Sequence, residues 1–169
     1  MKNVVLQLLK PEDYDRVAAL IESDSTLRNE FGIRENAAPS GSKIKVDFQS
    51  WCATHEAKMF SITRGSEITG IMTLSRINLV QQSGRLGFWL GSHYRRQGLG
   101  SRAFKNMLGI ARTMGLYQFS GSVEPSNQAS IKLWEKFGAS AQQSPEGNME
   151  YRLVLEKELA PSLARKSKS

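Results

Sequence analysis

The 169-residue sequence has few of the residues that form disulfides or bind metal ions. It contains one cysteine, Cys52, and two histidines, His55 and His93. An internal disulfide is therefore excluded, and no cluster has the Cys/His spacing of a zinc site. These absences favour a protein of a reducing compartment, the cytoplasm, that works without a metal.

Long apolar runs are also missing. The run at residues 4–9 is too short for the core of a signal peptide and leads directly into Lys10 and Pro11, without a small-residue cleavage site. No stretch approaches the roughly 20 apolar residues that a membrane-spanning helix needs. We therefore expect no membrane partner.

What the sequence does contain is typical of a globular protein. Hydrophobic residues make up 40% and charged residues 23% of the chain, which is the composition of a protein that buries a core. The length predicts a single domain, placed at residues 1–160, with a basic tail at residues 161–169. The net charge of +7 suggests that the protein binds phosphate, in a nucleic acid, a lipid headgroup or a phosphorylated cofactor.

The pattern of apolar residues predicts an α/β fold with a mixed sheet. Strands are expected at residues 3–9, 58–63, 67–78, 84–90, 116–123 and 149–156, and helices at residues 11–22, 45–55, 99–114 and 126–137. The segment before the second helix, from residue 23, is expected to be irregular as far as residue 44. Antiparallel hairpins dominate the first half and a strand-helix-strand crossover begins at residue 84, so the order is β-α-α-β-β-β-α-β-α-β.

The most informative segment is residues 94–101, with the sequence YRRQGLGS, between an expected strand and an expected helix. A helix N-terminus presents unpaired backbone N–H groups, glycines let the backbone approach an anion closely, and Arg95 and Arg96 add charged donors. This arrangement is typical of a phosphate-binding loop, although a tight turn with solvated arginines has the same features. The segment lacks the lysine of a Walker A loop and the full glycine and acid pattern of a dinucleotide fingerprint, so both motifs are excluded.

Two segments together resemble the signatures of one enzyme family. Residues 86–100 are similar to motif A of the GNAT N-acetyltransferases, whose consensus is Arg/Gln-x-x-Gly-x-Gly/Ala, and residues 123–139 look like motif B. The motifs occur in the family's order, and motif B is nearest to the ribosomal-protein alanine N-acetyltransferase branch. The resemblance implies the GNAT fold and an enzyme that moves an acetyl group from acetyl-CoA directly to a primary amine.

The resemblance also implies how acetyl-CoA is bound. The strand before the loop is expected to splay from its neighbour at a bulge and to pair its backbone with the pantetheine arm, while the amides from Arg96 to Ser101 hold the pyrophosphate. Asn127 matches the asparagine that contacts the cofactor arm. The implied cofactor-binding residues are Phe88, Trp89, Leu90, Arg95, Arg96, Gln97, Gly98, Leu99, Gly100, Ser101, Asn127 and Trp134.

The catalytic positions depart from the family pattern twice. Trp134 stands where many members have the tyrosine that protonates the departing thiolate, and Arg85 stands where members often have a glutamate that activates the amine. In the ribosomal-protein branch a serine one turn after the asparagine has the first role, and Ser130 matches it; a helix-surface serine is the equal alternative. Glu124 and His93 are the remaining candidates for activating the amine through water, against plainer roles as a turn acid and a loop residue.

The charge is unevenly distributed along the chain. Residues 93–115 carry +5, residues 157–169 carry +3, and residues 22–56, which line the acceptor side in GNAT proteins, carry −2. Much of the basic charge is therefore assigned to the phosphates of one coenzyme A. The acidic segment predicts a cationic or amine-bearing acceptor, which is a protein N-terminus, a lysine, a polyamine or an aminosugar.

Other functions compete with this one. A catalytically impaired acyl-CoA-binding module is the alternative, motivated by Trp134 and Arg85. A nucleic-acid-binding domain would use the charge of +7, but no recognition motif supports it, so we expect no nucleic-acid partner. A homodimer would be one way to complete the acceptor cleft, so the oligomeric state stays open.

Overall fold

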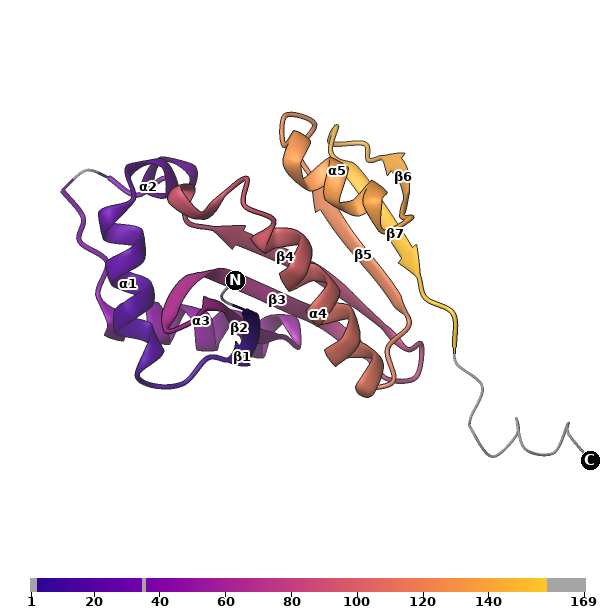
Figure 1. The fold of residues 1–169 in the computed structure, drawn as a ribbon, viewed down its shortest axis with the longest axis horizontal. Helices are drawn as coiled ribbons and strands as arrows, with labels where there is room; N and C mark the ends of the chain where they lie inside the picture. The colour runs from indigo at the N-terminus through magenta and orange to yellow at the C-terminus, as the bar shows by residue number, and fades with distance from the viewer. Residues whose placement is uncertain (1–2, 35, 158–169) are drawn as a thin grey trace, which may run out of the picture.

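The computed structural model describes residues 3–34 and 36–157, which form a seven-stranded sheet with helices packed against it (Figure 1). The order across the sheet is β1-β2-β3-β4-β5-β7-β6. Its strands are β1 (Val4–Leu8), β2 (Lys58–Arg64), β3 (Glu67–Asn78), β4 (Ser83–Leu90), β5 (Gln118–Val123), β6 (Ser140–Gln143) and β7 (Met149–Val154). Within this sheet β4 and β5 are parallel and the other neighbouring pairs are antiparallel, so the predicted mixed α/β sheet is confirmed.

Two apolar clusters hold the helices on the two faces of the sheet. The helices are α1 (Asp13–Ser23), α2 (Ser25–Glu30), α3 (Gly41–His55), the short 3-10 helix η1 (Ser92–Tyr94), α4 (Leu99–Thr113) and α5 (Gln128–Lys136). The larger cluster joins one face to α4 and α5, and the smaller joins the other face to α1 and α3. Strand β4 contributes to both clusters, because Leu86 and Leu90 belong to the larger one whereas Trp89 packs against the smaller one. A ligand at β4 is therefore within reach of both faces.

Two elements differ from the predicted order. Helix α2 lies inside the segment expected to be irregular, and β6 follows α5 where no strand was expected. Neither carries an apolar periodicity: α2 buries Leu27 alone among its residues, and all four residues of β6 are exposed. Helix α2 begins instead because the Asp24 carboxylate accepts a hydrogen bond from the Leu27 amide, at 3.1 Å.

The ends of several helices also differ from the predicted ends. Helix α1 begins at Asp13 rather than at Pro11, and α3 begins at Gly41, where the Ser40 hydroxyl accepts a hydrogen bond from the Lys43 amide. For α3 the reason is this cap, which sets a helix start more sharply than the apolar stripe does, whereas among the residues that the structure describes no side chain caps α1 at its N-cap Glu12. The predicted tail at residues 161–169 and the end of the predicted domain lie outside the described residues.

Two further features concern membranes and metals. Of the helices in the described ranges, none is long and apolar enough to cross a bilayer. The described part of the chain also contains no group of three His, Cys, Asp or Glu residues placed to hold a metal ion.

Candidate active site

The central feature of the site is a fork between β4 and β5. The two strands pair over three positions only, from Ser83–Gln118 to Arg85–Ser120. Beyond that point β4 continues beside β3 as far as Leu90, and β5 continues beside β7, so the two strands diverge (Figure 1). The backbone groups of β4 that face the fork have no strand partner there, and such groups can pair with an extended ligand arm.

The fork matches the splay implied by the sequence resemblance, but the bulge does not. The register shift on this side of the sheet is in β3, between Ser75 and Asn78, where Arg76 adopts a left-handed conformation with φ 47°. Over Phe88–Leu90 the ladder with β3 is regular. The predicted bulge in β4 is therefore wrong, and the strands separate because β4 follows β3 while β5 follows β7.

The Trp134 ring lies at the point where the strands separate. Its indole is 3% exposed, lies edge-on to Phe104 at a centroid distance of 5.0 Å, and stacks on Tyr151 at 5.8 Å. A Cβ built on Gly121 would lie 2.3 Å from Trp134 Cζ2 and 3.1 Å from the carbonyl oxygen of Leu86. Glycine at position 121 is thus the residue that lets a core indole approach both strands of the fork.

The glycine-rich loop places an uncapped helix end beside the fork. Gly98 has φ +76° at the N-cap of α4, a conformation that favours glycine, and among the described residues no side chain caps this helix. By contrast, the side chains of Asp24, Ser40 and Asn127 cap α2, α3 and α5. The first amides of α4, at Leu99, Gly100 and Ser101, are therefore open to an anion, together with the positive end of the helix dipole.

Side chains of the loop support its shape. Gln97 accepts a hydrogen bond from Arg64 Nη1 at 2.7 Å and donates one to the His93 carbonyl at 2.7 Å. Lys136 of α5 donates to the Ser101 hydroxyl at 2.8 Å, which ties the start of α4 to α5. Gln97 is therefore committed to the loop, whereas Arg96, with φ +61°, has an exposed side chain.

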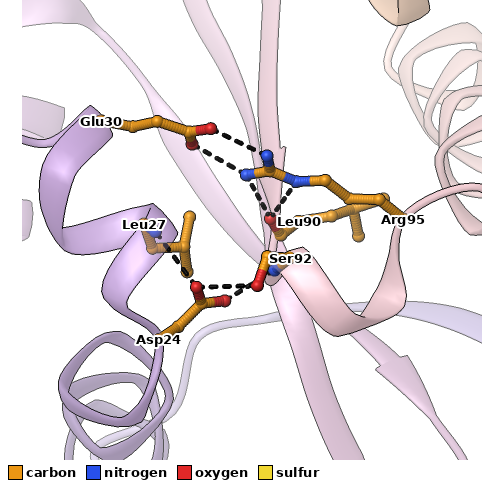
Figure 2. Close-up of polar contacts among 6 residues, drawn as sticks. All are labelled: Asp24, Leu27, Glu30, Leu90, Ser92 and Arg95. Carbon is orange, nitrogen blue, oxygen red and sulfur yellow. Dashed lines mark hydrogen bonds and ion pairs between the residues drawn. The ribbon is translucent and has the colours of Figure 1, made fainter.

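Arg95 joins the end of β4 to α2 (Figure 2). Its two terminal nitrogens each lie 2.8 Å from an oxygen of Glu30, and Nε and Nη2 donate to the Leu90 carbonyl at 3.1 and 3.0 Å. The paired guanidinium lowers the pKa of the Glu30 carboxyl, and the carboxylate raises the pKa of Arg95. In this structure the guanidinium is directed at Glu30 and at the backbone of β4, a role that the sequence did not reveal.

Asp24 makes a second connection between the same elements (Figure 2). Its buried carboxylate accepts hydrogen bonds from the Ser92 amide at 2.6 Å, the Ser92 hydroxyl at 2.8 Å and the Leu27 amide at 3.1 Å. Burial alone would raise the pKa of this carboxyl, but the donors from Ser92 and Leu27 outweigh burial, so its pKa lies below the ordinary value. Asp24 and Glu30 thus fix α2 against the end of β4 and the start of η1.

The catalytic candidates lie around the fork at different depths. Ser130 is partly buried and lies one helical turn before Trp134 on the same face of α5. The Asn127 side-chain oxygen accepts a hydrogen bond from the Ser130 amide at 3.2 Å, which leaves the Asn127 side-chain NH₂ for a ligand. Glu124 directly follows β5 and is exposed.

One carboxylate near the fork was missed by sequence reasoning. Glu150 of β7 lies opposite Ser122 of β5, and its carboxylate is 3.5 Å from Arg85 Nη1. Strand alternation could have found it, because buried Tyr151 and Leu153 alternate with Glu150 and Arg152. Glu150 is therefore a further carboxylate on the open face of the sheet beside the fork.

Known structures share this fold. RimL, a ribosomal L7/L12 alpha-N-protein acetyltransferase in complex with coenzyme A, is similar with a TM-score of 0.74 at 16% identity, over 94% of this chain and 97% of that chain. The Salmonella typhimurium acetyltransferase that modifies the N-terminal serine of 50S ribosomal subunit protein L7/L12 has a TM-score of 0.72 at 17% identity, over 92% and 97%. The microcin C7 self-immunity acetyltransferase MccE, in complex with acetyl-CoA and AMP, has a TM-score of 0.70 at 15% identity, over 90% and 92%.

At these identities the structural likeness shows a shared fold. No curated protein sequence matches the chain. The model of the acetyltransferase (GNAT) domain, however, matches residues 3–140, which is well over half of the sequence. The chain therefore belongs to the GNAT family of acetyltransferases and is an acetyl-transferring enzyme.

Proposed function

We propose that the protein binds acetyl-CoA in the β4–β5 fork and transfers the acetyl group directly to a primary amine. The main support for the proposal is that two sets of backbone groups lie near each other without secondary-structure partners. These are the edge of β4 that faces the fork and the first amides of α4. A ligand with an extended amide arm and a pyrophosphate at one end satisfies both. The same proposal assigns the activity to a single domain over residues 1–160.

Each part of the cofactor has candidate partners. The amides of Leu99, Gly100 and Ser101, with the exposed Arg96 side chain, would hold the pyrophosphate. The backbone over Phe88–Leu90 would pair with the pantetheine arm, and the Asn127 side-chain NH₂ would contact the same arm. Arg95 and Gln97 contribute indirectly, because they hold the backbone to which the cofactor binds.

When bound, acetyl-CoA supplies an acyl thioester already activated for attack. A nitrogen–carbon bond forms, the carbon–sulfur bond breaks, and a proton passes from the amine to the solvent or a base while the thiolate takes up another. Residues of the fork have to polarise the carbonyl and move these protons. We propose a backbone N–H near Leu90 for the first task and Ser130 as the thiolate's proton donor.

The base is assigned to a carboxylate on the acceptor side. Glu124, after β5, and Glu150, on β7, are the two candidates near the diverging strands. A water molecule bridging the amine and either carboxylate would suffice, because the attacking amine needs only to lose a proton during or before attack. Replacing each by glutamine, and comparing the pH dependence of kcat/KM, separates the two.

We propose a peptide N-terminus as the first acceptor class to test. Two of the similar structures are acetyltransferases whose names specify ribosomal protein L7/L12, one of them its N-terminal serine, and motif B resembles a ribosomal-protein branch. The free Cys52 agrees with the proposed cytoplasmic location. A small-molecule amine is the second class, since MccE was solved with acetyl-CoA and AMP.

A thiol-release assay tests the proposal. Purified protein, acetyl-CoA and a panel of peptides and small amines are mixed, and free CoA thiol is followed together with the mass of the acetylated product. We expect thiol release that depends on the amine and matches product formation. Acetyl-CoA binding without transfer to any amine would instead favour the acyl-CoA-binding module, which is motivated by Arg85 and by the buried Trp134.

A further inference from the structure

A polar cavity lies at the closed end of the fork. Its volume is about 810 Å³, and it is lined by the three residue pairs that join β4 to β5, Ser83–Arg85 and Gln118–Ser120. Leu86 of β4 is buried under α4, so strand alternation places the Arg85 side chain on the opposite face. The cavity therefore opens beside the fork on the face that α4 does not cover.

Three arginines from three different strands converge on this cavity. Arg85 of β4 pairs in register with Ser120 of β5, which in turn pairs with Arg152 of β7. Two strand spacings separate the two arginines, roughly 10 Å. Arg76, the third, lies at the β3 bulge, where the Ile77 amide donates to the carbonyl oxygen of Glu56 at 3.3 Å.

These positive charges have little internal compensation. Arg85 Nη1 lies 3.5 Å from the Glu150 carboxylate and 3.5 Å from the Ser120 hydroxyl, and Glu56 is the carboxylate that lines the cavity. Within residues 3–34 and 36–157, neither Arg76 nor Arg152 lies within ion-pair distance of a carboxylate. Guanidinium groups that face one cavity repel one another, and a bound oxyanion would relieve that repulsion.

Of the acids in the segment at residues 22–56, Glu56 lines the cavity, and three others are engaged elsewhere. Asp24 and Glu30 are engaged by Ser92 and Arg95, and Asp47 is paired with Lys43 at 2.7 Å. Some of the acids that predict a cationic acceptor are therefore already paired with other residues of the protein. Among the residues that line the cavity, three arginines therefore face one carboxylate.

We propose that the acceptor carries an oxyanion, a carboxylate or a phosphate, and that Arg76, Arg85 and Arg152 bind this group while the acceptor's amine enters the fork. The inference rests on the proposed function, because the cavity matters to acceptor choice only if the fork holds the thioester. Side chains of Asn78 and Gln118 in the lining add hydrogen-bond donors suited to the same group. The cavity has the size of a small-molecule or side-chain pocket, which favours a discrete anionic group.

The test uses two pairs of acceptors, and in each pair one member carries an anionic group that the other lacks. The first pair is a hexapeptide with a free N-terminal serine and three glutamates, and its counterpart with three glutamines. The second pair is phosphoethanolamine and ethanolamine. Binding to the CoA-saturated enzyme is measured by calorimetry, and we expect the anionic member of at least one pair to bind about tenfold more tightly. The pair that shows the preference identifies the source of the oxyanion.

Variants assign the preference to the cavity. The double variant Arg76→Gln/Arg152→Gln changes two exposed side chains, and Lys10→Gln removes one charge at the β1 edge of the sheet as a control. We expect the double variant to reduce the preference to about twofold or less and the control to retain it. Equal binding of charged and neutral members, or a preference that survives in the double variant, would overturn the inference. Failure of the wild-type protein to bind CoA at all would instead overturn the proposed function, and the inference with it.

Discussion

At the scale of single residues, Asp24 shows how a buried carboxylate can join two elements. Its pKa is lowered in the folded protein, so the charged form stabilises the fold above the ordinary pKa of about 4, and this contribution is lost as the pH falls through the lower folded-state value. Asp24→Asn keeps an N-cap for α2 but loses the charge. We expect it to cost about 1–3 kcal/mol of unfolding free energy at pH 7.

Urea denaturation of both proteins at pH 7 and at pH 2 measures this effect. At pH 2, below the ordinary pKa of an aspartate, less of the stabilisation by the charged form remains, so the difference in unfolding free energy between the proteins should shrink. The Glu30–Arg95 pair is present in both proteins and cancels in the comparison. An equally large difference at both pH values would show that the charge of Asp24 does not stabilise the fold.

Gly121 is important because the Trp134 ring packs directly against its backbone. A Cβ at this position would lie 2.3 Å from Trp134, whose ring is held between Phe104 and Tyr151. We expect Gly121→Ala to reduce the unfolding free energy by about 1–3 kcal/mol and to alter the near-UV circular dichroism of the indole. Gly109→Ala is the matched control, because a Cβ there meets nothing within 4 Å on a helix, and it should stabilise by about 0.5–1 kcal/mol. Equal stability of the two variants would contradict the account.

The role of a residue was predictable from the sequence where it depends on residues nearby in the chain. Gly98 and Asn127 are at the N-caps of α4 and α5, close to their expected places, because the caps depend on neighbouring residues. Arg95 was assigned to phosphate, yet its partner Glu30 is 65 positions away in the chain. No local pattern shows such a pairing, since it depends on how α2 packs against β4.

At the scale of elements, the uncapped start of α4 should bind anions and gain stability from added negative charge. Ser101→Asp places a carboxylate in the first turn, where the helix dipole and Lys136 favour it. We expect the free variant to be more stable by about 0.3–1 kcal/mol, while its affinity for acetyl-CoA falls about tenfold by repulsion from the pyrophosphate. Thermal melting and calorimetry report the two effects.

Ser101→Asn serves as the neutral control, with a side chain of similar size. A variant that is more stable but binds acetyl-CoA more weakly shows that position 101 acts in ligand binding, because a merely structural change would move both in the same direction. If Ser101→Asp and Ser101→Asn bound acetyl-CoA equally well, the start of α4 would not be the pyrophosphate site.

The elements themselves were predictable to the extent that their apolar pattern is strong. Strands β2, β3 and β4 and helix α4 lie within a few residues of their expected places, because β2 and β3 bury continuous runs, β4 alternates over its first half, and α4 buries a helical stripe. Helix α2 and strand β6 were missed because their residues are polar. The fork was expected from the family resemblance alone, since strand divergence leaves no local signature.

At the scale of the whole molecule, basic residues gather at the two proposed binding sites. Part of the net charge of +7 lies in two basic regions: one surrounds the glycine-rich loop, and another lines the cavity by Arg85 and Arg152. The two regions lie on either side of one fork. A single strand divergence thus links the proposed cofactor site with the proposed acceptor site.

The most direct measurement is amide hydrogen exchange, resolved by residue, with and without acetyl-CoA. We expect slower exchange at the amides of residues 86–90 that have no partner in β3, and at those of residues 99–101 in the first turn of α4. Amides of β1 and β2, at the far edge of the sheet, should be unaffected. Protection elsewhere, with unchanged exchange at the fork and at the start of α4, would contradict the claim that the fork between β4 and β5 holds the cofactor.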